Sequence, residues 1–236
     1  MTIKVGILQT GNPPPPLPGR FGSYSAMVQE LLGPQHEFVT FEVREGELPA
    51  DARSCAAYVI TGSASGVYDG DTWIGGLKQF VRDASGHSAM IGICFGHQLM
   101  AEAFGGQVIK SPRGWGIGLH RYDVQERAAW MDDARSIAVP ASHQDQVVKL
   151  PADARVLGGS EFTPYGIVEY PQRRAMSLQS HPEFTPEYAA ALIELRRSSK
   201  YSPEQADRAL ATLREPNDRS RVGGWLARFL RSSVRP

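Results

Sequence analysis

Residues 88–106 constrain the fold of this chain more than any other stretch. An apolar run from Met90 to Ile93 has the length of a buried strand, and apolar residues then recur at helical spacing until Gly105 and Gly106. Between them, Gly92-Ile-Cys94-Phe-Gly96 places small residues on both sides of a cysteine, which lets the backbone turn sharply and exposes the side chain. The start of a helix also favours the thiolate. Cys94 is therefore either a nucleophile at a strand-to-helix elbow or a core cysteine at a strand end.

Strands alternate with helices on the N-terminal side of this elbow. Runs rich in β-branched and aromatic residues predict strands at 3–10, the first and a central one, and at 36–43 and 55–61, while helical spacing predicts helices at 24–32 and from residue 72 onward. Such alternation is typical of an α/β fold: a doubly wound, mostly parallel sheet with helices on both faces. Its functional site is expected at the carboxyl ends of the strands.

The pattern changes after Gly106. Short strand-like pieces separated by Gly, Pro and Asp are typical of antiparallel hairpins, and they fall at 107–109, 116–124, 136–141, 154–159, 165–169 and 175–179. A helix follows at 186–197, and residues 198–236 are helical in pattern, with Trp225, Leu226, Phe229 and Leu230 on one face. We expect residues 1–198 to form one domain with antiparallel elaborations and residues 199–236 to be a C-terminal helical extension packed on it.

Composition excludes several classes of function. The chain has 236 residues with 25 basic and 25 acidic side chains, a balance that indicates neither a nucleic-acid footprint nor an anionic membrane surface. No apolar run approaches the ~18 residues of a membrane span, so we expect a cytoplasmic protein. The two cysteines, Cys55 and Cys94, indicate no disulfide framework. Cys94-x-x-His97 lacks a second ligand pair, so no metal is expected, and without a P-loop no cofactor is expected either.

Two further segments each allow a plain and a functional interpretation. The proline-rich segment Pro13–Pro18 is either a stiff loop at the carboxyl edge of the first strand, which we favour, or a lip of the active-site mouth or a docking segment. The tail is locally basic, and we favour a solvated helix face over a nucleic-acid or membrane contact; its arginines are Arg219, Arg221, Arg228, Arg231 and Arg235.

Two segments could complete a site around Cys94. A nucleophilic cysteine needs a base and a group that orients the base, and His181-Pro-Glu183 supplies both within one short turn. The loop that begins at Gly62 follows a predicted strand, so its bare N–H groups could face a developing negative charge. Taken alone, the first segment is equally a helix-start turn, and the second is a surface turn.

These residues in this order resemble the class I glutamine amidotransferase family, in its GMP-synthase-like glutaminase branch. The resemblance rests on Gly92-Ile-Cys94-Phe-Gly-His-Gln98 followed by His181-Pro-Glu183, and it covers about residues 3 to 195. It extends to the strand and loop around Gly62, the segment Gly114-Trp-Gly116-Ile-Gly118, and Ser142-His143-Gln-Asp145-Gln-Val147. The proline-rich segment and the tail lie outside it.

The resemblance implies roles for individual residues. Cys94 would attack the γ-carbonyl of glutamine or a γ-glutamyl compound, His181 would carry the proton to the leaving amine, and Glu183 would orient His181. Backbone N–H groups of Phe95 and the Gly62 loop would hold the oxyanion. The α-amino and α-carboxylate groups of the substrate would be bound by three other residues, namely Gln98, His143 and Asp145.

The resemblance does not determine which amine the reaction would release. Members that make GMP carry or pair with an ATP-dependent synthetase, whereas this sequence has no P-loop or comparable nucleotide fingerprint. The first expectation is a cysteine-dependent glutaminase that releases glutamate and ammonia for a separate acceptor or synthetase subunit. The alternative is a γ-glutamyl peptide or conjugate hydrolase that acts alone, and a third interpretation is a non-catalytic binding or regulatory module with the same fold.

Overall fold

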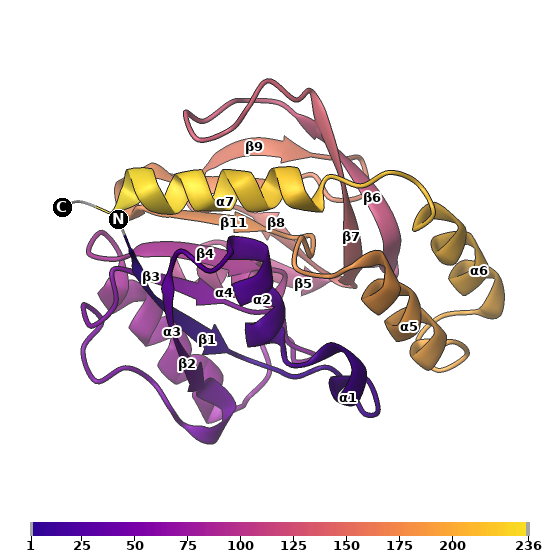
Figure 1. Cartoon of the computed structure of the whole chain (residues 1–236), viewed down its shortest axis with the longest axis horizontal. Coiled ribbons are helices and arrows are strands. Elements are labelled where there is room, and N and C mark those ends of the chain that lie inside the picture. The colour runs from indigo at the N-terminus through magenta and orange to yellow at the C-terminus, as the bar shows by residue number, and fades with distance from the viewer. Residues whose placement is uncertain (1, 235–236) are drawn as a thin grey trace.

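The structure is a computed structural model that describes residues 2–234. Arg235 of the basic tail lies outside the described residues. Figure 1 shows a large twisted sheet with helices on both of its faces, and a pair of helices beside its far end. The predicted α/β fold class is confirmed.

One half of the main sheet is parallel. Among the described residues this sheet has nine strands in the order β2-β1-β3-β4-β11-β10-β9-β6-β7. β1, expected to be central, has neighbours on both sides but is second from the edge. The parallel strands are β1 (Lys4–Gln9), β2 (Glu37–Glu42), β3 (Ala57–Ile60), β4 (Ala89–Ile93) and β11 (Ala175–Leu178). Their carboxyl ends therefore meet at one edge, where β4 leads into Cys94.

The other half is antiparallel, as the sequence predicts for the region after Gly106. It consists of β6 (Gly116–Val124), β7 (Ser136–His143), β9 (Arg155–Gly159) and β10 (Ile167–Tyr170). β5 (Gln107–Lys110) pairs with β8 (Asp145–Lys149) in a separate two-stranded sheet.

Two features of this region differ from the prediction. β11 pairs antiparallel with β10 but parallel with β4, in the middle of the sheet, so it belongs to the parallel half as much as to the hairpins. A short buried strand has the same apolar pattern in both settings, which is why its sequence did not distinguish them. β8 was not predicted at all, because its five residues alternate poorly between apolar and polar.

Helices on both faces of the sheet bury two separate apolar clusters. On one face lie α2 (Tyr24–Leu32) and α7 (Arg219–Ser233), whose Trp225 and Phe229 join the cluster built on β1 and β4. On the other lie α3 (Thr72–Ala84) and α4 (Phe95–Ala103). Figure 1 shows α7, the yellow helix, running along the sheet. The segment after residue 199 thus contributes large buried side chains to the main core.

Two helices flank the antiparallel half. α5 (Pro186–Arg196) packs against β6 and β7, and α6 (Pro203–Thr212) packs against β6. Ser202 and Gln205 form a capping box at the start of α6, with Pro203 in the first turn. The connection between α5 and α6 therefore lies beside the antiparallel half of the sheet.

The proline-rich segment is a loop that leads into a short helix, α1 (Pro18–Phe21), which was not predicted. Leu17 is buried in an apolar cluster with Tyr24, Met27, Phe184, Tyr188 and Leu192. The segment therefore packs beside the turn that carries His181.

The basic tail is less solvated than expected. Arg221 pairs with Asp132 and Asp218, and Arg228 donates to the carbonyl oxygen of Trp130. Arg228 is half-buried, whereas Arg221 and Arg231 are exposed, so part of the tail is solvated as expected. Within residues 2–234 no helix has the length and apolar character needed to cross a membrane.

Candidate active site

Cys94 stands at a strained turn between β4 and α4. Its backbone has φ 51° and ψ −99°, a region that residues other than glycine rarely adopt. The Cys94 N–H donates to the carbonyl oxygen of Leu178 in β11, and its own carbonyl oxygen accepts from the Gln98 N–H. The residue is thus held from both sides at the carboxyl edge of the sheet.

The two glycines around Cys94 are needed because α4 approaches the sheet closely. A Cβ at Gly92 would lie 2.6 Å from the carbonyl oxygen of Gly96, and a Cβ at Gly96 would collide with the carbonyl oxygen of Ile60 in β3. The elbow expected from Gly-x-Cys-x-Gly is therefore present, for the steric reason that the sequence suggests.

His181 and Glu183 form a buried pair next to this elbow. His181 Nδ1 lies 2.7 Å from Glu183 Oε1, and both side chains are almost fully buried. Cys94 is near enough to the same imidazole for its charge to act on the ring, which therefore lies between the carboxylate and the sulfur. Burial alone would lower the pKa of His181, but the neighbouring Cys94 and Glu183 outweigh it and raise that pKa. This arrangement favours the imidazolium form of His181.

An aromatic cluster supports the imidazole from behind. The rings of His181 and Phe184 stack with centroids 4.0 Å apart and planes 8° apart. Phe184 in turn contacts Tyr24 and Tyr188, whose hydroxyls hydrogen-bond to each other. The stack restricts the ring plane of His181, which a proton carrier between two fixed atoms requires.

Gln179 contacts the sulfur from the other side and is itself hydrogen-bonded to Gln98. Gln179 Nε2 lies 3.6 Å from Cys94 Sγ, while Gln179 Oε1 accepts from Gln98 Nε2 at 3.1 Å. Because Gln98 uses the oxygen of Gln179, the amide nitrogen is the end that faces the sulfur. Gln98 Nε2 also donates to the carbonyl oxygen of Asp145. Both N–H groups of Gln98 are thus engaged within the chain, and its oxygen is the atom left for a substrate.

Gly62 lies against the side chains of His181 and Cys94. A Cβ on Gly62 would lie 2.9 Å from His181 Cε1 and 3.8 Å from the Cβ of Cys94. The Thr10 hydroxyl, at the end of β1, contacts the carbonyl oxygens of Thr61 and Gly62. Since a trans peptide directs C=O and N–H in opposite directions, the Gly62 N–H points away from Thr10. Phe95 is the first residue of α4, where a backbone N–H has no partner within the helix.

His143 and Asp145 line the same pocket but differ in character. Burial lowers the pKa of His143 to about 3, so the ring is neutral at ordinary pH. Its Nδ1 lies 3.2 Å from the carbonyl oxygen of Asp145. The Asp145 carboxylate accepts a hydrogen bond from the Tyr68 hydroxyl at 2.9 Å. A buried neutral ring beside a half-buried carboxylate suits an ammonium group better than a second anion.

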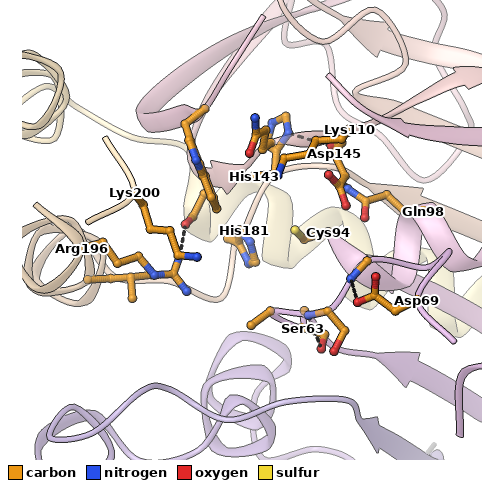
Figure 2. Close-up of a pocket in the computed structure, with 18 of the residues that line it drawn as sticks. Ser63, Asp69, Cys94, Gln98, Lys110, His143, Asp145, His181, Arg196 and Lys200 are labelled. Atoms are coloured by element: carbon orange, nitrogen blue, oxygen red, sulfur yellow. Dashed lines mark hydrogen bonds between the residues drawn. The ribbon is translucent and has the colours of Figure 1, made fainter. Parts of the chain in front are cut away.

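Most of these residues border one pocket of about 650 Å³ at the carboxyl edge of the sheet. Figure 2 shows Cys94 at its centre, with His181 on one side and Gln98 and Asp145 on the other. The pocket brings together Gly62, Cys94, Gln98, His143, Asp145 and His181, with Glu183 behind His181. Phe95 is not among the lining residues, and its side chain is buried against Trp73.

The pocket also contains residues that sequence reasoning missed. They come from the Gly62 loop, from β5 and from the end of α5 with the segment after it, and they include Tyr68, Asp69, Lys110, Arg196 and Lys200. Gln179, which does not line the pocket but contacts Cys94, was missed too, although it directly follows β11 and precedes Ser180-His181. Arg196 and Lys200 carry no local motif, and only the tertiary fold places them near Cys94.

The described residues contain no group of three or more His, Cys, Asp or Glu side chains placed to hold a metal ion. His97, the histidine nearest to Cys94 in sequence, is fully buried, with Nδ1 2.7 Å from the Ser177 hydroxyl. Burial lowers the pKa of His97 to about 3, so this histidine is a neutral structural residue.

The family model described as "Glutamine amidotransferase class-I" matches residues 32–195, from the end of α2 to α5. The chain belongs to this family. The matched range contains Cys94, His181 and Glu183, and it ends just before Arg196.

Curated relatives of this amidotransferase-family chain fall into more than one group. A glutamine amidotransferase-like protein of Schizosaccharomyces pombe is 28% identical over 98% of this chain and 99% of its own. Gamma-glutamyl peptidase 4 of Arabidopsis thaliana is 29% identical over 74% of this chain and 73% of its own. A glutamine-hydrolysing GMP synthase subunit of Archaeoglobus fulgidus is 37% identical, but over 40% of this chain and 51% of its own.

A solved glutamine amidotransferase structure from Thermotoga maritima covers 100% of both chains with a TM-score of 0.74 and 18% identity. At that identity the likeness shows the fold alone. It nevertheless extends through the C-terminal helices of this amidotransferase, beyond the range that the family model matches.

Proposed function

We propose that this class I amidotransferase is a cysteine-dependent hydrolase of γ-glutamyl amide bonds, and that its leaving amine is larger than ammonia. The observation that carries the reaction is the placement of Cys94 and His181 on the wall of one pocket, with Glu183 hydrogen-bonded to His181. Of the two reactions that the sequence predicts, this is the hydrolysis of γ-glutamyl peptides or conjugates.

The first half of the reaction would form a thioester. The Cys94 thiolate attacks the γ-carbonyl carbon, and backbone N–H groups of Phe95 and Gly62 stabilise the oxyanion, each by about 3 kcal/mol. As the tetrahedral intermediate collapses, the C–N bond breaks and the His181 imidazolium gives its proton to the leaving nitrogen. The free amine departs, and the glutamyl group stays on the sulfur.

The second half would release glutamate. His181, now neutral, takes a proton from a water molecule, and the resulting hydroxide attacks the thioester carbon. The C–S bond breaks, the thiolate returns beside the imidazolium, and the γ-carboxylic acid leaves and loses its proton to solvent. Glu183 holds Nδ1 of His181 throughout, so that Nε2 always faces the sulfur.

The size of the pocket supports a leaving amine larger than ammonia. At about 650 Å³ it lies within the range of about 300–1,000 Å³ that holds drug-sized ligands, and a single glutamine would fill only part of it. The similarity to gamma-glutamyl peptidase 4 covers nearly three quarters of both chains, which supports the same interpretation.

Glutamine hydrolysis for a separate synthetase is the second candidate. The GMP synthase relative from Archaeoglobus fulgidus supports it through the higher identity of its shorter match. The non-catalytic alternative is disfavoured by the buried His181–Glu183 pair, because an imidazole and a carboxylate are costly to bury without a use.

The test is a substrate panel of glutamine, γ-glutamyl dipeptides and γ-glutamyl alkylamides, with Cys94→Ala as the matched control. We expect glutamate and free amine from the peptides, and a higher kcat/KM for them than for glutamine. Preferred hydrolysis of glutamine would favour the second candidate. No product above the Cys94→Ala level, with any compound, would refute the reaction itself.

A further inference from the structure

The charges that line the pocket are separated into two groups. Its two acidic residues, Asp69 and Asp145, lie with Gln98 and Lys110 on one side of Cys94. Arg196 and Lys200 lie on the opposite side, where His181 faces Cys94 (Figure 2). A ligand that spans the pocket would therefore meet a mixed, partly acidic wall at one end and a basic wall at the other.

The two cations of the basic wall have no carboxylate partner among the described residues. Arg196 donates from Nη1 to the Ser142 hydroxyl at 3.1 Å, and its guanidinium carbon lies 5.9 Å from the centroid of the Trp115 ring. Lys200 is exposed in the connection between α5 and α6 and forms no ion pair there. By contrast, the neighbouring Arg197 pairs with both Glu194 and Asp207.

The favourable interaction of cations with the end of a helix explains the place of Arg196 but not that of Lys200. Arg196 is the last residue of α5, where a cation interacts favourably with the helix dipole. Lys200, however, lies beyond the end of the helix, and both side chains border the pocket. Two unneutralised cations on one wall of a pocket make a site for an anion, and the planar guanidinium suits a carboxylate in particular.

The position of His181, the proton donor, determines which part of the substrate lies against the basic wall. His181 must protonate the leaving nitrogen, so the leaving amine lies on the His181 side of Cys94. Arg196 lies on that side of Cys94, beyond His181, and lines the pocket together with Tyr24 (Figure 2). Gln98 and Asp145, joined through Gln179 to the sulfur, occupy the glutamyl side.

We infer that Arg196 and Lys200 form a subsite for a carboxylate carried by the leaving amine. The substrate class is then γ-glutamyl amino acids or peptides, rather than glutamine or γ-glutamyl alkylamides. This inference rests on the proposed γ-glutamyl hydrolysis and names its substrate. Both residues lie outside the range that the family model matches, so the subsite is a feature of the segment in which α5 ends.

The test compares two compounds that differ only in this charge, γ-glutamylalanine and γ-glutamylalaninamide. We expect the wild-type protein to have a kcat/KM at least about tenfold higher for the carboxylate, as for a charge-assisted hydrogen bond, and high salt should reduce the ratio. Lys200→Gln and Arg196→Gln should each lower the ratio, and the double variant should bring it close to one. Arg196→Lys should retain part of it.

Arg208→Gln is the matched control, because Arg208 is an exposed cation on α6 that does not line the pocket. Its ratio should equal that of the wild-type protein. Equal kcat/KM values for the two compounds in the wild type, or an undiminished ratio in the double variant, would overturn the subsite. Since Lys200 is exposed, Lys200→Gln should fold normally even if an Arg196 variant does not.

A binding measurement separates failure of the subsite from failure of the proposed reaction. Calorimetric titration of Cys94→Ala with the two compounds requires no turnover. Tighter binding of γ-glutamylalanine, lost in a Cys94→Ala variant that also carries Arg196→Gln and Lys200→Gln, would support the subsite even if the wild type hydrolysed neither compound. Equal affinities would refute it.

Discussion

Arg219 donates a hydrogen bond from Nε to the carbonyl oxygen of Pro182, at 2.9 Å, in the turn between His181 and Glu183. Its Nη2 also donates to the carbonyl oxygen of Glu183 at 3.2 Å. The first turn of α7 thus holds the backbone of the turn that carries the proposed base and its orienting carboxylate. The preceding residue, Asp218, fixes the start of α7 to β7. Its N–H donates to the carbonyl oxygen of Ala138, and its carboxylate accepts from the Ala138 N–H.

Arg219→Ala should lower kcat more than it raises KM, because Arg219 positions the turn and lies outside the pocket lining. We expect a loss of about tenfold in kcat and of about 1–2 kcal/mol in the free energy of unfolding, as for a charged hydrogen-bond donor. Steady-state kinetics with a γ-glutamyl dipeptide and denaturant unfolding measure the two effects. Arg231→Ala, an exposed cation on the same helix, should change neither; a pure KM effect in Arg219→Ala would contradict the positioning role.

Glu183→Gln should shift the alkaline limb of kcat/KM to lower pH. Burial lowers the pKa of His181, but the charges of Cys94 and Glu183 raise it to about 10 from the ordinary 6.5, and the amide removes one of these two charges. The imidazolium that protonates the leaving amine is then lost at a lower pH. Kinetics from about pH 5 to 11 give the limb, which belongs to the Cys94–His181 pair as a unit. An unshifted limb would show that Glu183 does not stabilise the imidazolium.

The raised pKa of His181 also predicts how the stability of the protein depends on pH. A pKa that is raised on folding contributes stability that is complete below the unfolded value of 6.5 and is lost as pH rises through the folded value. We therefore expect the free energy of unfolding of the wild type, relative to Glu183→Gln, to decline between neutral and strongly alkaline pH. Denaturant unfolding at several pH values measures this difference, and a difference that stays constant with pH would contradict the raised pKa.

Local sequence patterns predicted the elbow at Cys94 and the short turn that brings His181 and Glu183 together. Gly92 and Gly96 indicated a close approach of helix and strand, and the structure contains that approach. The spacing of His181 and Glu183 indicated one short turn, and the two side chains meet there. These features are determined by neighbours within a few residues, which is why a single sequence was sufficient.

Features that depend on distant packing could not be predicted. The parallel pairing of β11 with β4 joins segments far apart in the chain. Arg196 and Lys200 reach the pocket because α5 packs against β6 and β7, and Arg219 reaches Pro182 because α7 crosses the sheet. Nothing in the local sequence of these three residues distinguishes them from solvated surface cations.

Trp225→Ala tests whether the C-terminal segment belongs to the same folding unit as the rest of the chain, which we propose. Trp225 is 1% exposed and belongs to the cluster that contains Ile7 and Ile91 of the sheet. Removal of a buried aromatic side chain costs about 3–5 kcal/mol. We expect a loss of that size in one cooperative unfolding transition, whereas a separate early transition with the remainder unchanged would indicate an independent unit.

Gly62→Ala should abolish most activity while leaving the fold intact. The new Cβ would lie 2.9 Å from His181 Cε1, closer than real Cβ atoms come to a neighbour, so the imidazole would have to move away from Cys94. Because proton transfer depends on sub-ångström placement, we expect kcat to fall by about a hundredfold or more. Gly70→Ala is the matched control in the same loop, since nothing lies within 4 Å of its Cβ. Circular dichroism and thermal unfolding should be alike for both variants and the wild type. An active Gly62→Ala variant would mean that His181 does not act from the position it occupies here.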